Sequence, residues 1–63
     1  MCESKVYVVE DGDMKLLAED VVYLKKEGDT YVIVNLQGER ITLTNYVLRD
    51  IDFLSHKVVF ARG

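Results

Sequence analysis

Two side chains in this sequence are suited to nucleophilic or metal chemistry, the thiol of Cys2 and the imidazole of His56, and each is the only residue of its kind. Nucleophilic catalysis needs a nucleophile, a base and an orienting acid within hydrogen-bond reach. Cys2 and His56 lie at opposite ends of the sequence, and the Ser55-His56 pair is typical of a solvent-exposed turn. Asp50 and Asp52 are better explained as solubilising charges than as an acid–base pair. The sequence therefore predicts no catalytic residues and no enzyme.

The position of Cys2 directly after Met1 gives this residue a second donor group. Removal of Met1 would place a free α-amine and a thiol on one residue, and these two groups chelate a metal through a five-membered ring. Their free pKa values are about 8.5 for the thiol and about 7.7–8.0 for the amine, so metal binding displaces protons. A thiolate favours soft or borderline ions. While Met1 is retained, the thiolate needs a backbone nitrogen, a water or another side chain as a partner.

One such residue supplies too few ligands for a closed metal site. A two-fold axis beside the amino terminus would bring in a second copy of Cys2, and the pair would offer two sulfurs and two nitrogens. A tetragonal arrangement of nitrogen and sulfur suits Ni²⁺ or Cu²⁺, whereas four-coordinate Zn²⁺ prefers tetrahedral geometry. The simpler alternative is an incidental, mobile thiol at a chain terminus.

The segments that must position these residues read as short β-strands. β-Branched and aromatic residues gather in runs that are separated by turn sequences containing Gly12, Gly28 and Gly38, where glycine supplies the positive φ of a tight turn. The stretch 14–20 fits helical spacing as well, but it is short for a helix and is predicted to be extended. The other predicted strands are 4–10, 21–26, 30–36, 40–44, 46–54 and 57–61.

This pattern predicts an all-β fold, a small curled barrel of about six short antiparallel strands that forms a single domain over residues 1–63. Alternation with period two is clearest in 40–44. In 46–54 the same rule predicts that Val47, Ile51 and Phe53 point inward while Asp50 and Asp52 face water.

The composition favours a foldable domain in a reducing cytoplasm. Hydrophobic residues make up 49% of the 63 residues and charged residues 30%, which disfavours both a disordered tail and a membrane protein. A single cysteine cannot form an intramolecular disulfide. No apolar run approaches the roughly 20 residues of a membrane span, and the opening residues lack the order of a signal peptide.

A domain this small gains little net stability from its own core, and a disulfide, a metal or an oligomer usually supplies the remainder. Large rings spread along the strands are expected to lie partly outside so small a core, and a homodimer would cover them. Tyrosines that bury their ring faces in an ordinary monomer are the alternative. The rings are Tyr7, Tyr23, Tyr31, Tyr46, Phe53 and Phe60.

The net charge of −3 disfavours a nucleic-acid partner, because phosphate binding needs a basic patch. An RNA-binding or general interaction module remains the alternative function. In that alternative an aromatic strand face, formed by Tyr23 and Tyr31 with Lys25, would stack unpaired bases.

The start Met1-Cys2-Glu3-Ser4-Lys5-Val6, followed by a β-rich chain of this length with no other cysteine, resembles the CooT family of small proteins, which are also catalogued as predicted RNA-binding proteins. The resemblance implies an SH3-like barrel, a homodimer, and Ni²⁺ bound near the subunit interface through Cys2. It further implies a nickel-binding accessory role in the maturation of a nickel enzyme such as carbon monoxide dehydrogenase. It assigns no role to His56.

Overall fold

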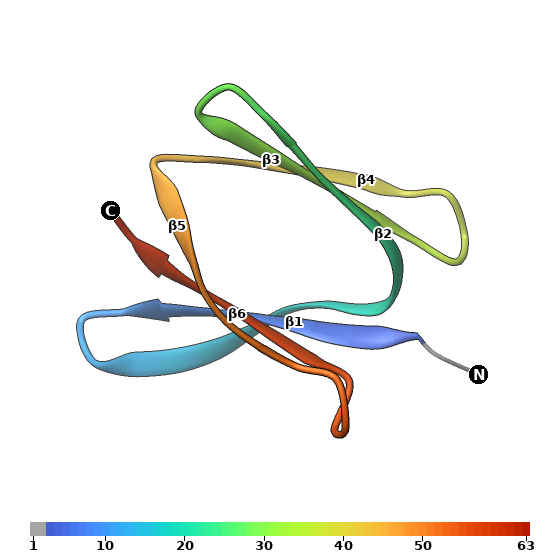
Figure 1. Cartoon of the computed structure of the whole chain (residues 1–63), viewed down its shortest axis with the longest axis horizontal. Coiled ribbons are helices and arrows are strands. Elements are labelled where there is room, and N and C mark those ends of the chain that lie inside the picture. The colour runs from blue at the N-terminus through green and yellow to red at the C-terminus, as the bar shows by residue number, and fades with distance from the viewer. Residues whose placement is uncertain (1–2) are drawn as a thin grey trace.

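The computed structural model describes residues 3–63, so Cys2 lies outside the described residues. The chain forms six strands and an all-β fold, as the sequence predicted (Figure 1). Their bounds are β1 Ser4–Glu10, β2 Asp13–Glu27, β3 Thr30–Asn35, β4 Arg40–Thr44, β5 Tyr46–Asp52 and β6 Lys57–Arg62.

The strands form one mixed sheet in the order β4-β3-β2-β1-β6-β5, with β4 and β5 as its edges. The prediction that all strands are antiparallel is wrong for one pair, because β1 and β6 are parallel. Four hairpins reverse the chain, whereas β4 passes into β5 at Asn45, whose φ of 68° turns a corner between strands that do not pair. Because β4 and β5 do not form a hairpin, β6 runs in the same direction as β1. Closure into an SH3-like barrel remains a prediction.

Strand β2 is longer than predicted because the segments 14–20 and 21–26 are one strand. It pairs with β1 through its first half and with β3 through its second half, and Asp20 adopts a positive φ of 56° near the change of partner. Figure 1 shows β2 curving from β1 towards β3 and β4. The bend in β2 folds the sheet over the core.

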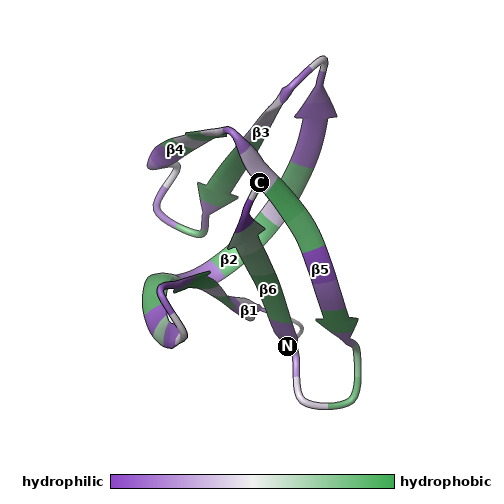
Figure 2. Cartoon of the chain, turned by 90° about the vertical axis from the view of Figure 1, so that its left-hand side faces the viewer, coloured by the Kyte–Doolittle hydropathy of each residue, from purple (hydrophilic) through white to green (hydrophobic). Residues whose placement is uncertain are grey.

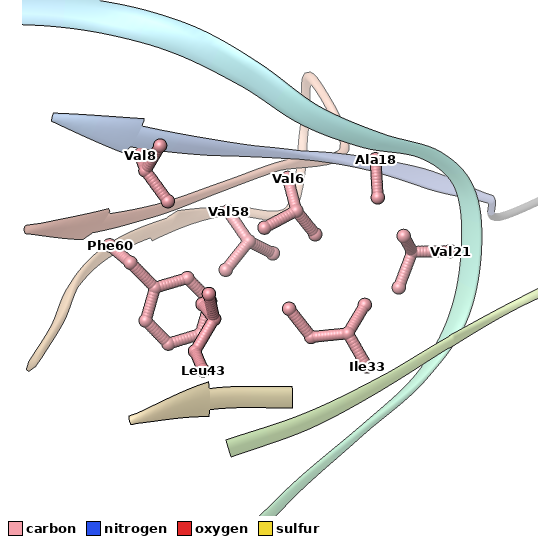
Figure 3. Packing of buried hydrophobic residues seen from close by; sticks show 8 residues of the cluster. All are labelled: Val6, Val8, Ala18, Val21, Ile33, Leu43, Val58 and Phe60. Atoms are coloured by element: carbon pink, nitrogen blue, oxygen red, sulfur yellow. The ribbon is translucent and has the colours of Figure 1, made fainter. Parts of the chain in front are cut away.

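The core lies between the two halves of the curled sheet (Figure 3). Val6, Ile33 and Phe60 are its most completely buried large side chains. The rings of Tyr31 and Phe60 meet edge to face, with centroids 4.8 Å apart. Burying a side chain such as Phe60 contributes about 1.5–3 kcal/mol, so these few residues carry much of the stability of so small a domain.

The predicted inward set of the fifth strand is only partly right. A register shift between Leu48 and Asp50 inserts an extra residue, which switches the side of the strand that faces the core. Leu48 packs against the core instead of Val47, which is 54% exposed. Beyond the shift, Ile51 pairs with core residue Val58.

No helix in the described residues is long and apolar enough to cross a membrane.

Candidate functional site

Strand β1 begins at Ser4, two residues after Cys2, and its neighbour on one side is the start of β6. Lys5 is the register partner of Lys57, and the backbone N–H of Lys5 donates a 2.9 Å hydrogen bond to the carbonyl oxygen of His56. The parallel β1–β6 pairing therefore brings His56 to the beginning of the described chain. Sequence order had separated these residues, and no local signal predicted a parallel pair across more than fifty residues.

The turn that carries His56 is held by a side chain. Oδ1 of Asp52 accepts hydrogen bonds from the backbone N–H groups of Leu54 (3.0 Å) and Ser55 (3.1 Å). These bonds to Ser55 and Leu54, together with the charge of Lys57, lower the pKa of the Asp52 carboxyl. The structure thus gives Asp52 a local role in shaping the turn beyond the solubilising charge that was predicted for it.

A groove of about 440 Å³ lies between β2 and the β5–β6 hairpin, and Ser4 and His56 form part of its wall. Its other walls are mainly apolar and include Val22 and Tyr23 of β2 and Phe53 of the turn. Figure 2 shows hydrophobic residues in the last part of β5 and again in the turn before β6. The groove suits an apolar group better than an ion, because hydrocarbon surface cannot replace the water around a charge.

A second hollow of about 390 Å³ is lined by Glu3, Tyr7, Ser55 and His56, among others. The carboxylate of Glu3 and the imidazole of His56 both border this hollow, and Glu3 directly follows Cys2 in the sequence. Both groups are metal donors in other proteins. Within residues 3–63, however, no group of three or more His, Cys, Asp or Glu residues is placed to hold a metal ion.

Cys2, the one metal ligand that the sequence predicted, stays a prediction because it lies outside the described residues. His56 borders the same end of β1 as Ser4.

A polar cluster at the other end of β1 was not predicted from the sequence. The hydroxyl of Tyr46 donates a hydrogen bond to Oε2 of Glu10, and Nη1 of Arg62 lies 3.3 Å from the same oxygen. The Arg62 guanidinium also lies over the Tyr46 ring, 5.6 Å from its centroid. The Tyr46 hydrogen bond is the main cause of the lowered pKa of Glu10, and the same bond raises the pKa of Tyr46. The cluster joins the ends of β1 and β6 to the start of β5.

The aromatic face of the alternative RNA-binding interpretation does not form as expected. Tyr23 and Lys25 share one face of β2, whereas Tyr31 pairs with Lys26 and packs against the core on the opposite face. The ammonium of Lys25 is 2.6 Å from a carboxylate oxygen of Glu27. A base that stacked on Tyr23 would therefore find neither Tyr31 nor an unpaired Lys25 beside it.

A curled six-stranded mixed sheet, whose first strand starts in the wall of an apolar groove, defines a small all-β protein. The family model for the CO dehydrogenase accessory protein CooT matches residues 1–61. The chain belongs to the CooT family of CO dehydrogenase accessory proteins.

A solved structure gives an independent view of the fold. A crystal structure of a candidate CooT from Carboxydothermus hydrogenoformans is similar to this chain with a TM-score of 0.87 at 19% sequence identity, over 98% of each chain. At that identity the likeness establishes the fold. No curated protein matched the sequence.

Proposed function

We propose that this protein is a nickel-binding accessory protein that acts in the maturation of a nickel enzyme such as carbon monoxide dehydrogenase. The observation that carries the proposal is the family match, which runs from residue 1 to residue 61 and so includes Cys2. The role is that of a carrier and not of an enzyme. Nickel is the cargo in this role, taken up by the protein and handed on by ligand exchange.

In the proposed site, two copies of Cys2 from a homodimer hold one Ni²⁺ through their thiolates. Two sulfurs with two nitrogens suit tetragonal Ni²⁺, and the nitrogens come from the terminal amines after removal of Met1 or from backbone amides while Met1 is retained. Because the ligands must lose protons, nickel affinity rises with pH through the range in which the thiol ionises. The proposal includes a reducing cytoplasm, which keeps Cys2 as a thiol, and an SH3-like barrel closed around the core.

The proposal is supported by the short distance in sequence between Cys2 and β1. The strand begins at Ser4, and only Glu3 lies between Ser4 and Cys2. A ligand near the start of β1 is held next to a strand that pairs on both sides, with β2 and with β6. Such an anchored neighbour lowers the conformational entropy lost when the ligand is fixed.

The optical spectrum of the reduced protein with Ni²⁺ tests the proposal. We expect a thiolate-to-nickel charge-transfer band in the wild type and none in Cys2→Ala. A band of unchanged intensity in Cys2→Ala would contradict the thiolate assignment.

A further inference from the structure

The two edges of the sheet differ in how they are protected against pairing with a further strand. In β5 the register shifts between Leu48 and Asp50. The same strand carries the charged side chains of Arg49, Asp50 and Asp52. Bulges and charges are the usual features that keep an edge strand from accepting another strand. Strand β4 has no register shift and no charge beyond its first residue, Arg40, so its edge is open to pairing.

The outer edge of β4 presents the backbone groups of alternate residues. The N–H of Asn35 donates a 3.0 Å hydrogen bond to the carbonyl oxygen of Glu39, at the end of the β3–β4 ladder. Hydrogen-bonded and non-hydrogen-bonded pairs alternate along an antiparallel ladder, so the next residues of β4 that bond to β3 are Ile41 and Leu43. The N–H and C=O groups that point away from β3 belong to the alternate residues Arg40, Thr42 and Thr44.

These outward groups have no backbone partner within residues 3–63. Strand β3 is the one described strand that pairs with β4. The hydrogen bonds of the turns and corners involve Glu39 before the strand and Asn45 after it, but none of the three outward residues. All three residues are exposed, so a further strand can reach the edge without displacing another part of the described chain.

We infer that the outer edge of β4 binds an extended segment of a partner protein, which adds to the sheet as an antiparallel strand. In this mode of recognition the main-chain hydrogen bonds supply affinity, and alternate side chains supply specificity. The inference goes beyond the proposed function, since it gives the protein a surface for a polypeptide partner that does not depend on nickel.

The charge at this edge selects an acidic residue in the partner. Arg40 is exposed, and its guanidinium forms no ion pair with another of the described residues. The neighbouring Glu39 carboxylate instead accepts a 2.7 Å hydrogen bond from the side-chain amide of Asn35. Lys25 and Glu27, on the same face of the sheet, balance each other at 2.6 Å. A carboxylate opposite Arg40 therefore meets an uncompensated positive charge.

The side chains of β4 also define the alternation of the partner segment. Ile41 is partly buried and Leu43 is buried, and both lie on the core side of the sheet. Residues of the partner opposite them extend the core and are therefore apolar. Thr42 and Thr44 are exposed on the other side, where β-branched polar residues pair well. The partner segment thus alternates threonine-like with apolar residues and places a carboxylate opposite Arg40.

A synthetic peptide of this pattern tests the inference. The peptide Thr-Val-Thr-Val-Glu, with blocked ends, can run antiparallel to β4 with its glutamate opposite Arg40. We expect the amide signals of Arg40, Thr42 and Thr44 to shift in the amide NMR spectrum on titration, and their hydrogen exchange to slow. A peptide with lysine in place of glutamate should bind more weakly, because it sets like charges opposite each other.

Methylation of single backbone nitrogens in the peptide separates strand addition from other modes of binding. N-methylation of the central threonine removes a donor that faces β4, and should raise the dissociation constant about tenfold or more, the scale of one lost hydrogen bond. N-methylation of the preceding valine is the matched control. It removes a donor that faces away from β4 and should change the dissociation constant much less. Both peptides are tested on the unaltered protein, so a folding defect cannot explain the difference.

Arg40→Glu tests the charge on the side of the protein. Its affinity for the glutamate peptide should fall about fivefold or more, because a like-charge pair replaces an exposed ion pair. Its affinity for the lysine peptide should rise. Arg49→Glu makes the same change of charge at the protected edge, β5, and should leave both affinities nearly unchanged.

The outcomes are distinct from those of the nickel experiments. No binding of the glutamate peptide at about 1 mM would overturn the inference, as would equal losses from the two N-methylations or shifts confined to residues outside β4. Shifts of the β4 amides that depend on protein concentration without peptide would also overturn it, because they would place a second copy of the chain at this edge. Each of these results leaves nickel binding intact, and Arg40→Glu is expected to keep the nickel affinity of the wild type.

Discussion

The backbone N–H of Lys5 donates a 2.9 Å hydrogen bond to the carbonyl oxygen of His56. This bond belongs to the parallel pairing of β1 with β6 and places the only histidine beside the start of the first strand. His56 is therefore an alternative nitrogen donor to test against the Cys2 thiolate.

Replacing His56 by Asn is expected to change nickel affinity less than tenfold, because the proposed ligands are two thiolates and amine or amide nitrogens. The fold is retained, since the hydrogen bond from Lys5 uses the backbone carbonyl and Asn tolerates the positive φ of 56° at this position. Calorimetric titration with Ni²⁺ measures the effect. A loss as large as that in Cys2→Ala would make the imidazole a main ligand.

Ile33→Val should lower the free energy of unfolding by about 0.5–1.5 kcal/mol, because Ile33 is only 1% exposed and the surrounding core cannot fully close the space. Urea unfolding measures the change. The same truncation at Ile41, which is only partly buried, should cost less. Equal losses at the two positions would contradict the assignment of the core.

The stability of the protein should fall as the pH drops below about 5, in part through Glu10. Its pKa is lowered from the ordinary 4.5, chiefly by the hydrogen bond from Tyr46, so the folded state holds this proton more weakly than the unfolded chain does. The stabilisation is present above the unfolded pKa and is lost as the pH falls through the folded one. Glu10→Gln should flatten this part of the profile of unfolding free energy against pH.

Glu19→Gln, at an exposed position, controls for the removal of one negative charge. A profile for Glu10→Gln that stays as steep as that of the wild type would show that the cluster with Tyr46 and Arg62 does not contribute.

The protein should show no submicromolar binding to single-stranded RNA at low salt. The net charge is −3, and Tyr31 is packed edge to face on Phe60 instead of lying free for stacking. Fluorescence anisotropy with labelled oligonucleotides measures this. Tight binding that weakens steeply between low and moderate salt would favour the RNA-binding function instead.

The strands were predictable because their limits are set locally. Glycines such as Gly12 and Gly28 take positive φ at the turns, and β-branched residues fill the segments between them. The β1–β6 pairing was not predictable, because it depends on a corner at Asn45 instead of a hairpin. The set of β5 side chains that face the core was also predicted incorrectly. A single inserted residue near Arg49 interrupts the alternation and changes which side chains face the core.

The difference between local and long-range determinants also applies to the candidate site. The chemistry of Cys2 can be argued from its residue type and position, whereas the proximity of His56 to Ser4 depends on long-range pairing. The exposure of Phe53, which alternation had predicted to point inward, became evident only when the turn after β5 was placed. The sequence had predicted a core residue at this position.

The most direct test of the account is calorimetric titration of the reduced protein with Ni²⁺, comparing the wild type with Cys2→Ala and with His56→Asn as the control. The account predicts one Ni²⁺ for two chains in the wild type. In Cys2→Ala it predicts an affinity lower by about a hundredfold or more, because a direct ligand should cost at least as much as the roughly 10–100-fold of an outer-shell partner. Unchanged affinity in Cys2→Ala, or one tightly bound Ni²⁺ for each chain in the wild type, would contradict it.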